Sequence, residues 1–238
     1  MKTIAIMQPY LFPYIGYFQL IKHVDTFVLY DDVQFVNRGW INRNRILSNK
    51  KECNIVFPLK KASSRDKINT RVFADNIDHF KKKQTAIIRQ SYQKAPFYNE
   101  AIEIIESVLN FLTGDLVLAI YKHFENILEY ISINNNLILS SEFSLPSNFT
   151  GQKRIIEICK CLNATDYVNS IGGIELYSPK IFNENNLTLH FLKPRLEPYE
   201  QFGGEFVPGL SIIDVMMFNS PDKIQSMLDD YELITPKD

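Results

Sequence analysis

Cysteines and long apolar runs are scarce in this chain, and each absence excludes a class of protein. The three cysteines are Cys53, Cys159 and Cys161, and the last two form a Cys-x-Cys pair on a predicted helix, where their side chains point in different directions. We therefore expect neither a disulfide framework nor a zinc site, and a reducing cytoplasm fits best. No run of about 18 apolar residues occurs, so no transmembrane segment is predicted. Lys2 and the four apolar residues after it do not make a signal peptide.

The chain also lacks a large excess of positive or negative charge, and it lacks the usual sequence motifs of metal sites and hydrolases. The net charge is −1 over 238 residues, which argues against general electrostatic binding to duplex nucleic acid. None of the four histidines has a second ligand at metal spacing, so we expect no metal. His123 lies on an apolar helix stripe and is predicted to be a core residue. The chain has no Gly-x-Ser-x-Gly elbow and no Cys-His pair, which argues against a hydrolase with a side-chain nucleophile.

What the chain does have is an alternation of strand and helix periodicity at both ends. Strands are predicted over residues 3–7, 26–30, 53–59, 68–73, 137–141, 166–170 and 187–192. Helices are predicted over residues 16–23, 76–95, 98–112, 116–131, 152–162 and, as a pair, 212–233. Residues 38–46 are too polar for a core strand and predict a loop or short helix. The pattern predicts one α/β domain over residues 1–238, with a mostly parallel sheet, a core from 1–75 and 150–238, and an inserted helical block from 76–132.

The first strand-helix-strand unit carries the candidate site. The first strand breaks on Gln8-Pro9-Tyr10, and the second is followed by Asp31-Asp32-Val33-Gln34. In open α/β sheets ligands bind just beyond the carboxyl ends of the strands. We therefore expect Gln8, Tyr10, Asp31 and Asp32 to line one cavity together with Arg43.

Asp31 and Asp32 are the candidate catalytic residues. A carboxylate at a strand end could act as general base toward an amine or a hydroxyl group if partial burial tunes its pKa. Adjacent residues point to opposite sides of a strand, so one aspartate could face the ligand while the other orients a neighbour. The alternative is a solvated strand end without a chemical role.

Two groups of residues are candidates for binding a substrate. The first is a basic and aromatic cluster in which arginines could grip phosphates and Trp40 could stack on a base or sugar ring; its members are Arg38, Trp40, Asn42, Arg43, Asn44 and Arg45. The second is the turn before the first helix, with the phenols of Tyr10, Tyr14 and Tyr17 and with Gly16 near a helix N-terminus that attracts anions. An ordinary basic surface loop and ordinary packing phenols are the competing interpretations.

Longer motifs carry a resemblance to a known family. The run from Ile6 to Ile21, the segment Asp31-Asp32-Val33-Gln34, and Trp40 with Asn42-Arg43-Asn44 resemble the WbqC-like proteins. The segments Tyr92 to Tyr98 and Pro208 to Asp214 are similar to the same family, so the likeness spans essentially the full chain.

The resemblance implies a role in O-antigen or related glycan biosynthesis and, for some members, transfer of glycine to an amino sugar. The partner it implies is a nucleotide-linked amino sugar, with no cofactor and with a glycyl donor carried on an acyl carrier protein or a tRNA. The first strand-helix-strand unit also resembles a nucleotidylyltransferase-type domain, in which a His-x-Gly-His motif begins the helix. Tyr14 and Tyr17 replace both histidines here, which argues against nucleotidyl transfer. The alternatives are a non-catalytic protein that binds a nucleotide or a partner, and a nucleotide-activating enzyme of the same pathway.

Overall fold

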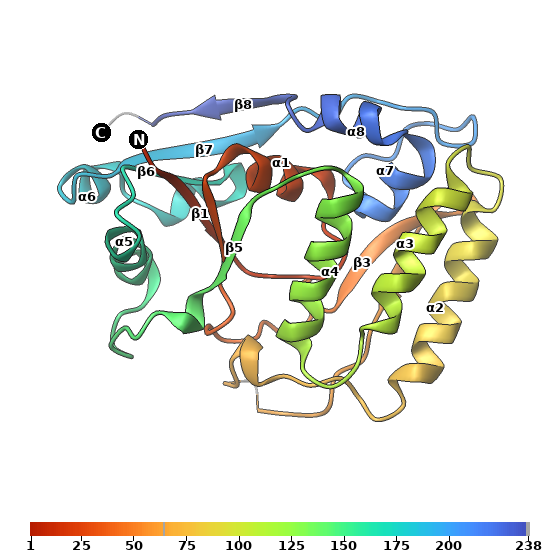
Figure 1. The fold of residues 1–238 in the computed structure, drawn as a ribbon, viewed down its shortest axis with the longest axis horizontal. Coiled ribbons are helices and arrows are strands. Elements are labelled where there is room, and N and C mark those ends of the chain that lie inside the picture. The colour runs from red at the N-terminus through yellow and green to blue at the C-terminus, as the bar shows by residue number, and fades with distance from the viewer. Residues whose placement is uncertain (64, 237–238) are drawn as a thin grey trace.

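A six-stranded sheet forms the centre of the computed structural model, which describes residues 1–63 and 65–236 (Figure 1). Its strand order is β5-β2-β1-β6-β7-β8. The strands are β1 (Thr3–Met7), β2 (Thr26–Leu29), β5 (Asn136–Leu139), β6 (Asp166–Ser170), β7 (Thr188–Pro194) and β8 (Tyr231–Ile234). All neighbouring pairs are parallel except β7 with β8, which are antiparallel. The predicted α/β fold with a mostly parallel sheet is confirmed.

The direction in which strands are added reverses next to β1. From β1 the chain adds β2 and β5 on one side, and it then returns to place β6 and β7 on the other side. Crossover connections before and after this reversal leave opposite faces of the sheet, which opens a crevice at the carboxyl ends of the two central strands. The boundary between β1 and β6 is therefore the place where a ligand site is expected.

Successive side chains of the buried strands point to opposite faces of the sheet and pack into two separate hydrophobic cores. Ala5, Phe27 and Leu29 belong to one core, whereas Ile4 and Val28 belong to the other. This follows from the strand period of two residues. The first core packs helices α1 (Ile15–His23), α4 (Leu116–Tyr130), α7 (Ile212–Phe218) and α8 (Pro221–Met227). The second core packs helices α5 (Gly151–Cys161) and α6 (Pro179–Asn183).

The helical block consists of α2 (Ile77–Tyr92), α3 (Tyr98–Asn110) and α4, which stand side by side in Figure 1. The predicted bounds agree with the observed ones to within a few residues because each helix has a clear apolar stripe. Asp115 caps α4 as its position suggests, and its Oδ1 accepts a hydrogen bond from the Leu118 amide at 2.8 Å. His123 is fully buried on α4, which confirms it as a core residue.

Four local predictions differ from the structure. Residues 38–46 are predicted as a loop or short helix, but strand β3 (Arg43–Ser48) begins within them. Residues 53–59 are predicted as a buried strand; residues 53–56 do belong to a strand, β4 (Lys51–Val56), but it is mostly exposed and forms an antiparallel hairpin with β3. Its turn residues Asn49 and Lys50 both have positive φ, 50° and 59°, as a two-residue hairpin turn requires. The expected strand at 68–73 is instead a short 3-10 helix, η1 (Ile68–Thr70). The last segment of the expected helix pair is strand β8, which pairs with β7.

Two further 3-10 helices follow strands of the sheet. η2 (Ser140–Glu142) comes directly after β5, and η3 (Ile171–Leu176) comes directly after β6. Both therefore lie at the carboxyl edge of the sheet. Among the helices that the structure describes, none combines the length and apolar character that crossing a membrane requires.

Candidate functional site

A crevice of about 810 Å³ lies at the carboxyl ends of β1 and β6, where the strand order reverses. Four segments line it: the end of β1 with the start of α1, Tyr30 after β2, the loop before β3, and the end of β6 with η3. Its lining includes Gln8, Tyr10, Tyr14, Gly16, Tyr17, Tyr30, Trp40, Asn169, Gly173 and Tyr177. The position is the one that the fold predicts for a ligand site.

The N-terminus of α1 forms one wall of this crevice. Tyr14 is its N-cap and makes no side-chain capping bond, and the first turn holds no acidic residue. A side chain at Gly16 would come within 2.6 Å of Pro194 Cγ and 2.5 Å of the Tyr14 ring, so only glycine fits here. Free amides at a helix N-terminus attract anions, and this end is open to the crevice.

The turn between β1 and α1 is locked in a strained conformation. Phe12 has φ of 50°, which is uncommon for a bulky residue. Its amide donates to Nε2 of His123 at 2.9 Å, and its carbonyl accepts hydrogen bonds from Asn44 Nδ2 and, at 2.9 Å, from Ser211 Oγ. Strain of this kind persists only where the surroundings over-determine it, and it is concentrated at functional sites. Buried side chains from three distant segments therefore fix the shape of the crevice wall.

The opposite wall comes from the end of β6 and was not predicted. Asn169 donates from Nδ2 to the hydroxyl groups of Tyr167 at 2.6 Å and Tyr177 at 3.2 Å. Its Oδ1 accepts from the Ser170 amide at 2.7 Å, and a side chain at Gly173 would come within 2.9 Å of that oxygen. The signal that could have found this wall is a predicted strand over 166–170 that ends just before Gly172-Gly173.

Asp31 and Asp32 are not among the residues that line this crevice, so the structure does not bring the two aspartates and Arg43 into this cavity with Gln8 and Tyr10, as was expected. Asp32 forms an ion pair with Arg154 of α5 and accepts a hydrogen bond from Ser140 Oγ at 2.6 Å. Asp31 is 1% exposed, and its Oδ1 accepts from the Ser141 amide at 2.9 Å. Tyr30 takes the crevice side, so the next residue, Asp31, points away from it, and Asp32 is held by Arg154 and Ser140. A catalytic role for the two aspartates stays a prediction.

Trp40 is half-exposed at the mouth of the crevice, where it was expected to contact a ligand. A second hollow of about 300 Å³ shares Tyr10, Tyr14 and Trp40 with the crevice and adds Arg45. The Arg45 guanidinium lies 5.2 Å from the centre of the Trp40 ring and pairs with Glu52 at 2.9 Å. Arg45 therefore borders the surface that the crevice and the second hollow form together.

Four other expected binding residues do not line the crevice. Asn42 donates to the carbonyl of Phe57 at 2.8 Å, and Asn44 holds the strained turn and borders the second hollow. Gln34 pairs with Lys67 in a β-bridge. Arg43 lines neither hollow. The side chains of Asn42 and Asn44 thus support backbone near the site, and the proposed ligand contacts of all four residues stay predictions.

The crevice is lined by uncharged groups. No acidic, basic, histidine or cysteine side chain is among its lining residues in the described part of the chain. Burial raises the pKa of Tyr30 to about 12 and raises the pKa of Tyr17 and Tyr177 as well. These phenols therefore stay protonated near neutral pH and can serve as hydroxyl donors.

The long loop over residues 199–209 is tied to the core at its start. The buried carboxylate of Asp214 accepts hydrogen bonds from Tyr199 at 2.6 Å, Gln201 at 2.6 Å and Tyr92 at 2.7 Å. Burial raises the pKa of Asp214, although the three donors oppose this effect. This network joins α2, α7 and the loop, and it explains why Tyr92 and Asp214 lie in distinctive motifs without lining the crevice.

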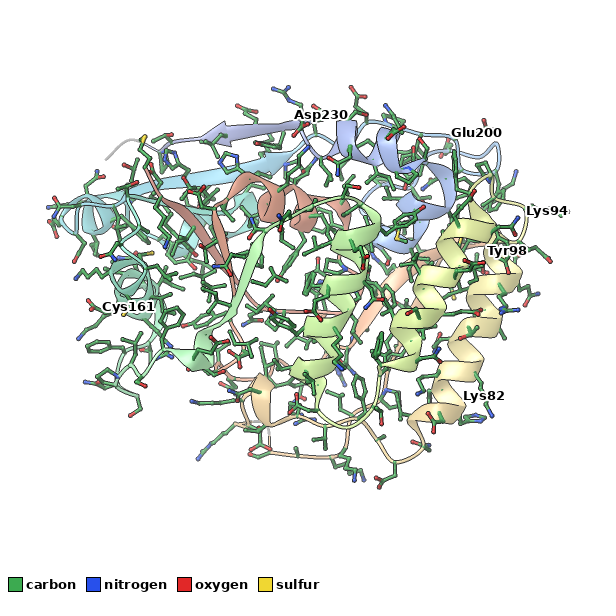
Figure 2. All side chains as sticks on the ribbon, in the orientation of Figure 1. Lys82, Lys94, Tyr98, Cys161, Glu200 and Asp230 are labelled. Atoms are coloured by element: carbon green, nitrogen blue, oxygen red, sulfur yellow. The ribbon has the colours of Figure 1, made fainter. Side chains whose placement is uncertain are left out.

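Two exposed lysines lie at the helical block, Lys82 on α2 and Lys94 just after that helix. Both project from the outer side of the block, away from the sheet (Figure 2). Among the described residues, Arg45 is the charged residue that lines the hollow adjoining the crevice.

Comparison with known proteins places the chain in a family. The WbqC-like protein family matches residues 8–226. The chain is 29% identical over 222 residues to a protein of Mycobacterium tuberculosis described as "Uncharacterized protein Rv1507c", with 92% of this chain and 94% of that protein covered. No solved structure matches the chain. The matched residues include every segment that lines the crevice except Ile6 and Met7, and the chain belongs to the WbqC-like protein family.

Proposed function

We propose that the crevice binds a nucleotide-linked amino sugar and that the protein transfers a glycyl group to the amine of that sugar. The observation that carries the proposal is the position and lining of the crevice: it lies where the strand order reverses, between the open N-terminus of α1 and the ring of Trp40. The glycine donor and the pathway come from the family resemblance.

The geometry suits each part of such a substrate. A volume of about 810 Å³ is in the usual range for a small-molecule site. Phosphate groups fit the free amides at the start of α1, and Arg45 in the adjoining hollow adds a positive charge. A base or sugar ring fits the exposed face of Trp40, and hydroxyl groups fit the phenols and amides of the two walls.

The transfer step is attack by the sugar amine on the carbonyl carbon of a glycyl ester or thioester. The new C–N bond replaces the C–O or C–S bond of the donor, and the leaving oxygen or sulfur takes up the proton that the amine loses. No cofactor is required by this scheme. We place the reaction in the cytoplasm, with the donor carried by a tRNA or an acyl carrier protein.

The proposal is tested by incubating purified protein with a panel of nucleotide-linked amino sugars and glycyl donors, followed by mass spectrometry. The expected product is the nucleotide sugar carrying one added glycyl group. The control is the same incubation with the corresponding sugar that lacks the amine, which should gain no mass. If no sugar binds and no donor yields product, the proposal fails.

One observation favours a second candidate, a protein that binds the nucleotide sugar or a partner without catalysis. The described residues that line the crevice provide no carboxylate, imidazole or thiol group. If calorimetry shows tight sugar binding while every donor leaves the sugar unmodified, this second function is the correct one.

A further inference from the structure

The side chains at the end of β6 form a hydrogen-bond network whose direction follows from its donors. The Ser170 amide lies 2.7 Å from Oδ1 of Asn169, and a backbone amide can only donate. Oδ1 is therefore the acceptor end of the Asn169 side chain, and Nδ2 is the donor end. Both protons of Nδ2 are used, one by the Tyr167 hydroxyl at 2.6 Å and the other by the Tyr177 hydroxyl at 3.2 Å.

The proton of the Tyr167 hydroxyl stays inside the protein. Tyr167 is fully buried, and its hydroxyl oxygen lies 3.4 Å from the carbonyl oxygen of Ile6. Burial raises the pKa of both tyrosines, and the contact between their hydroxyl groups raises the pKa of Tyr167 further while it opposes the rise in the pKa of Tyr177. These signs are those of a hydrogen bond in which Tyr167 donates and Tyr177 accepts.

The Tyr177 hydroxyl is left with a proton that this wall does not accept. Its oxygen accepts from Asn169 and Tyr167, and among the described residues it donates to no acceptor. Tyr177 and Asn169 both line the crevice, as does Tyr30 at the end of β2. Burial is the main cause that raises the pKa of Tyr30 to about 12, and Tyr177 adds to it, so the two phenols lie near each other. The proton of Tyr177 is therefore available to an oxygen atom in the crevice.

Packing holds the ring that carries this hydroxyl in place. The Tyr177 ring meets the rings of Tyr167 and Phe182 edge to face, with centres 5.7 Å and 5.8 Å apart. A side chain at Gly173 would come within 2.9 Å of Asn169 Oδ1 and 3.4 Å of the Tyr177 ring, so glycine lets the network close. A donor that is fixed before the ligand arrives needs no reorganisation when negative charge develops on the atom it faces.

We propose that Tyr177 donates a hydrogen bond to the carbonyl oxygen of the glycyl donor during transfer, and that Asn169 is the positioning residue that directs its proton into the crevice. This inference rests on the proposed function. It assigns a catalytic group to a crevice whose described lining residues provide no carboxylate, imidazole or thiol.

The transfer step shows what this donor contributes. The amine nitrogen bonds to the carbonyl carbon, and one electron pair of the C=O double bond moves to the oxygen. That oxygen becomes negative, which strengthens its hydrogen bond with Tyr177. When the double bond re-forms, the C–O or C–S bond of the donor breaks, and the leaving atom takes up the proton that the amine loses. Tyr177 keeps its own proton throughout, in agreement with its raised pKa.

The direction of the hydroxyl groups is tested in the free protein, without any ligand. Tyrosine labelled with ¹³C at Cζ is observed by NMR in a mixture of H₂O and D₂O, where a slowly exchanging hydroxyl gives separate signals for OH and OD. The signals are assigned with Tyr→Phe variants. The Tyr167 signal should be split and the Tyr177 signal should not, because only the latter proton faces the open crevice.

Asn169→Asp reverses the direction of the network. Both carboxylate oxygens accept, so Tyr177 should turn its proton toward residue 169 and away from the crevice. Its Cζ signal should then split. A Tyr177 signal that is split in the wild type, or that is the same in the wild type and in Asn169→Asp, overturns the proposal.

Steady-state kinetics with the glycyl donor and sugar that yield product test the catalytic role. Tyr177→Phe should lower kcat at least about a hundredfold, the typical effect of losing one donor to an oxyanion, while KM for the sugar stays close to that of wild type. Asn169→Asp should lower kcat similarly although the Tyr177 hydroxyl is still present. The matched control Tyr121→Phe removes a hydroxyl that donates to the Leu137 carbonyl at 3.3 Å, outside the crevice, and should change neither constant.

The two measurements separate this inference from the proposed function. If product forms and kcat of Tyr177→Phe stays within about tenfold of wild type, or only KM rises, the inference fails and the proposed function stands. If the hydroxyl groups exchange as described but no donor yields product, the direction of the Tyr177 proton stands, while the proposed function and the catalytic role of Tyr177 fall together.

Discussion

Three consecutive residues at the carboxyl edge of the sheet have three different surroundings. Tyr30 lines the crevice, Asp31 is buried and accepts a hydrogen bond from the Ser141 amide, and Asp32 pairs with Arg154 of α5. A sequence motif does not say which of these neighbours contacts a ligand, because their directions depend on where the strand ends. The structure places Asp32 in a buried ion pair, whereas the described donors to the Asp31 carboxylate are the neutral groups of Ser140 and Ser141.

The ion pair leads to a stability prediction. The side chains of Arg154 and Asp32 are 8% and 11% exposed, so Arg154→Met leaves a buried carboxylate unpaired. Removing one partner of a buried pair commonly costs about 3–5 kcal/mol. Urea denaturation should show a loss of free energy of unfolding in that range. The control Lys22→Met breaks the more exposed pair with Asp229 and should cost under about 1 kcal/mol. Equal losses in the two variants would contradict the prediction.

The two arginines of β3 give a matched pair for ligand binding. Arg45 lines the hollow next to Trp40, whereas Arg43 lines neither hollow. Losing a charge-assisted contact to phosphate removes about 1.5–3 kcal/mol, so Arg45→Ala should weaken binding of a nucleotide-linked sugar at least about tenfold. Arg43→Ala should change it much less. Calorimetry checks both, and a larger effect for Arg43→Ala would restore the role expected from the sequence.

At the scale of elements, the helices and the central strands could be predicted because their apolar residues recur at one clear period. The hairpin of β3 (Arg43–Ser48) and β4 (Lys51–Val56) could not be predicted as a unit. It lies outside the six-stranded sheet, and only some of its side chains are buried. Its turn uses Asn49-Lys50, which lacks the glycine that normally marks a two-residue turn. β8 was missed because a four-residue edge strand carries little periodic signal.

Helix α4 holds the strained turn through His123, and this residue leads to a prediction about how stability depends on pH. Burial lowers the pKa of His123 to about 3, so the native state keeps it neutral while the unfolded chain takes up a proton below about pH 6.5. The stability that depends on neutral His123 is complete above pH 6.5 and is lost as the pH falls toward 3, at about 1.4 kcal/mol per pH unit.

Chemical denaturation at several pH values between 4.5 and 7 measures this loss. His123→Gln can still accept from the Phe12 amide but does not titrate, so its stability should fall less steeply with decreasing pH than that of wild type. The difference between the two slopes isolates His123 from the carboxylates that both proteins share. Parallel slopes would show that the prediction is wrong.

At the scale of the whole molecule, half of the site could be predicted from the sequence. The wall from Gln8 to Tyr17 was expected because a strand, a turn and a helix N-terminus are adjacent in the chain. The wall from Asn169 to Tyr177 was not, because only the strand order places β6 beside β1, and that order cannot be read from periodicity. Sites between strands far apart in sequence are hidden for the same reason.

This arrangement predicts where ligand binding stabilises the molecule. Hydrogen exchange with a saturating nucleotide-linked sugar should slow at the amides of residues 8–17 and 169–177, because the ligand bridges the two walls. The amides of α2 and α3 should exchange at unchanged rates, since these helices contribute nothing to the crevice. Protection that is strongest in α2 and α3 would contradict the location of the site.

The single tryptophan of the chain gives the crevice a spectroscopic signal of its own. Trp40 is 49% exposed at the mouth, and no other indole contributes to the emission. A ligand that covers this ring removes water from it, so the fluorescence maximum should shift to shorter wavelength or be quenched as the site fills. Titrations therefore need no attached dye, and unchanged emission at saturation would show that the ligand binds elsewhere.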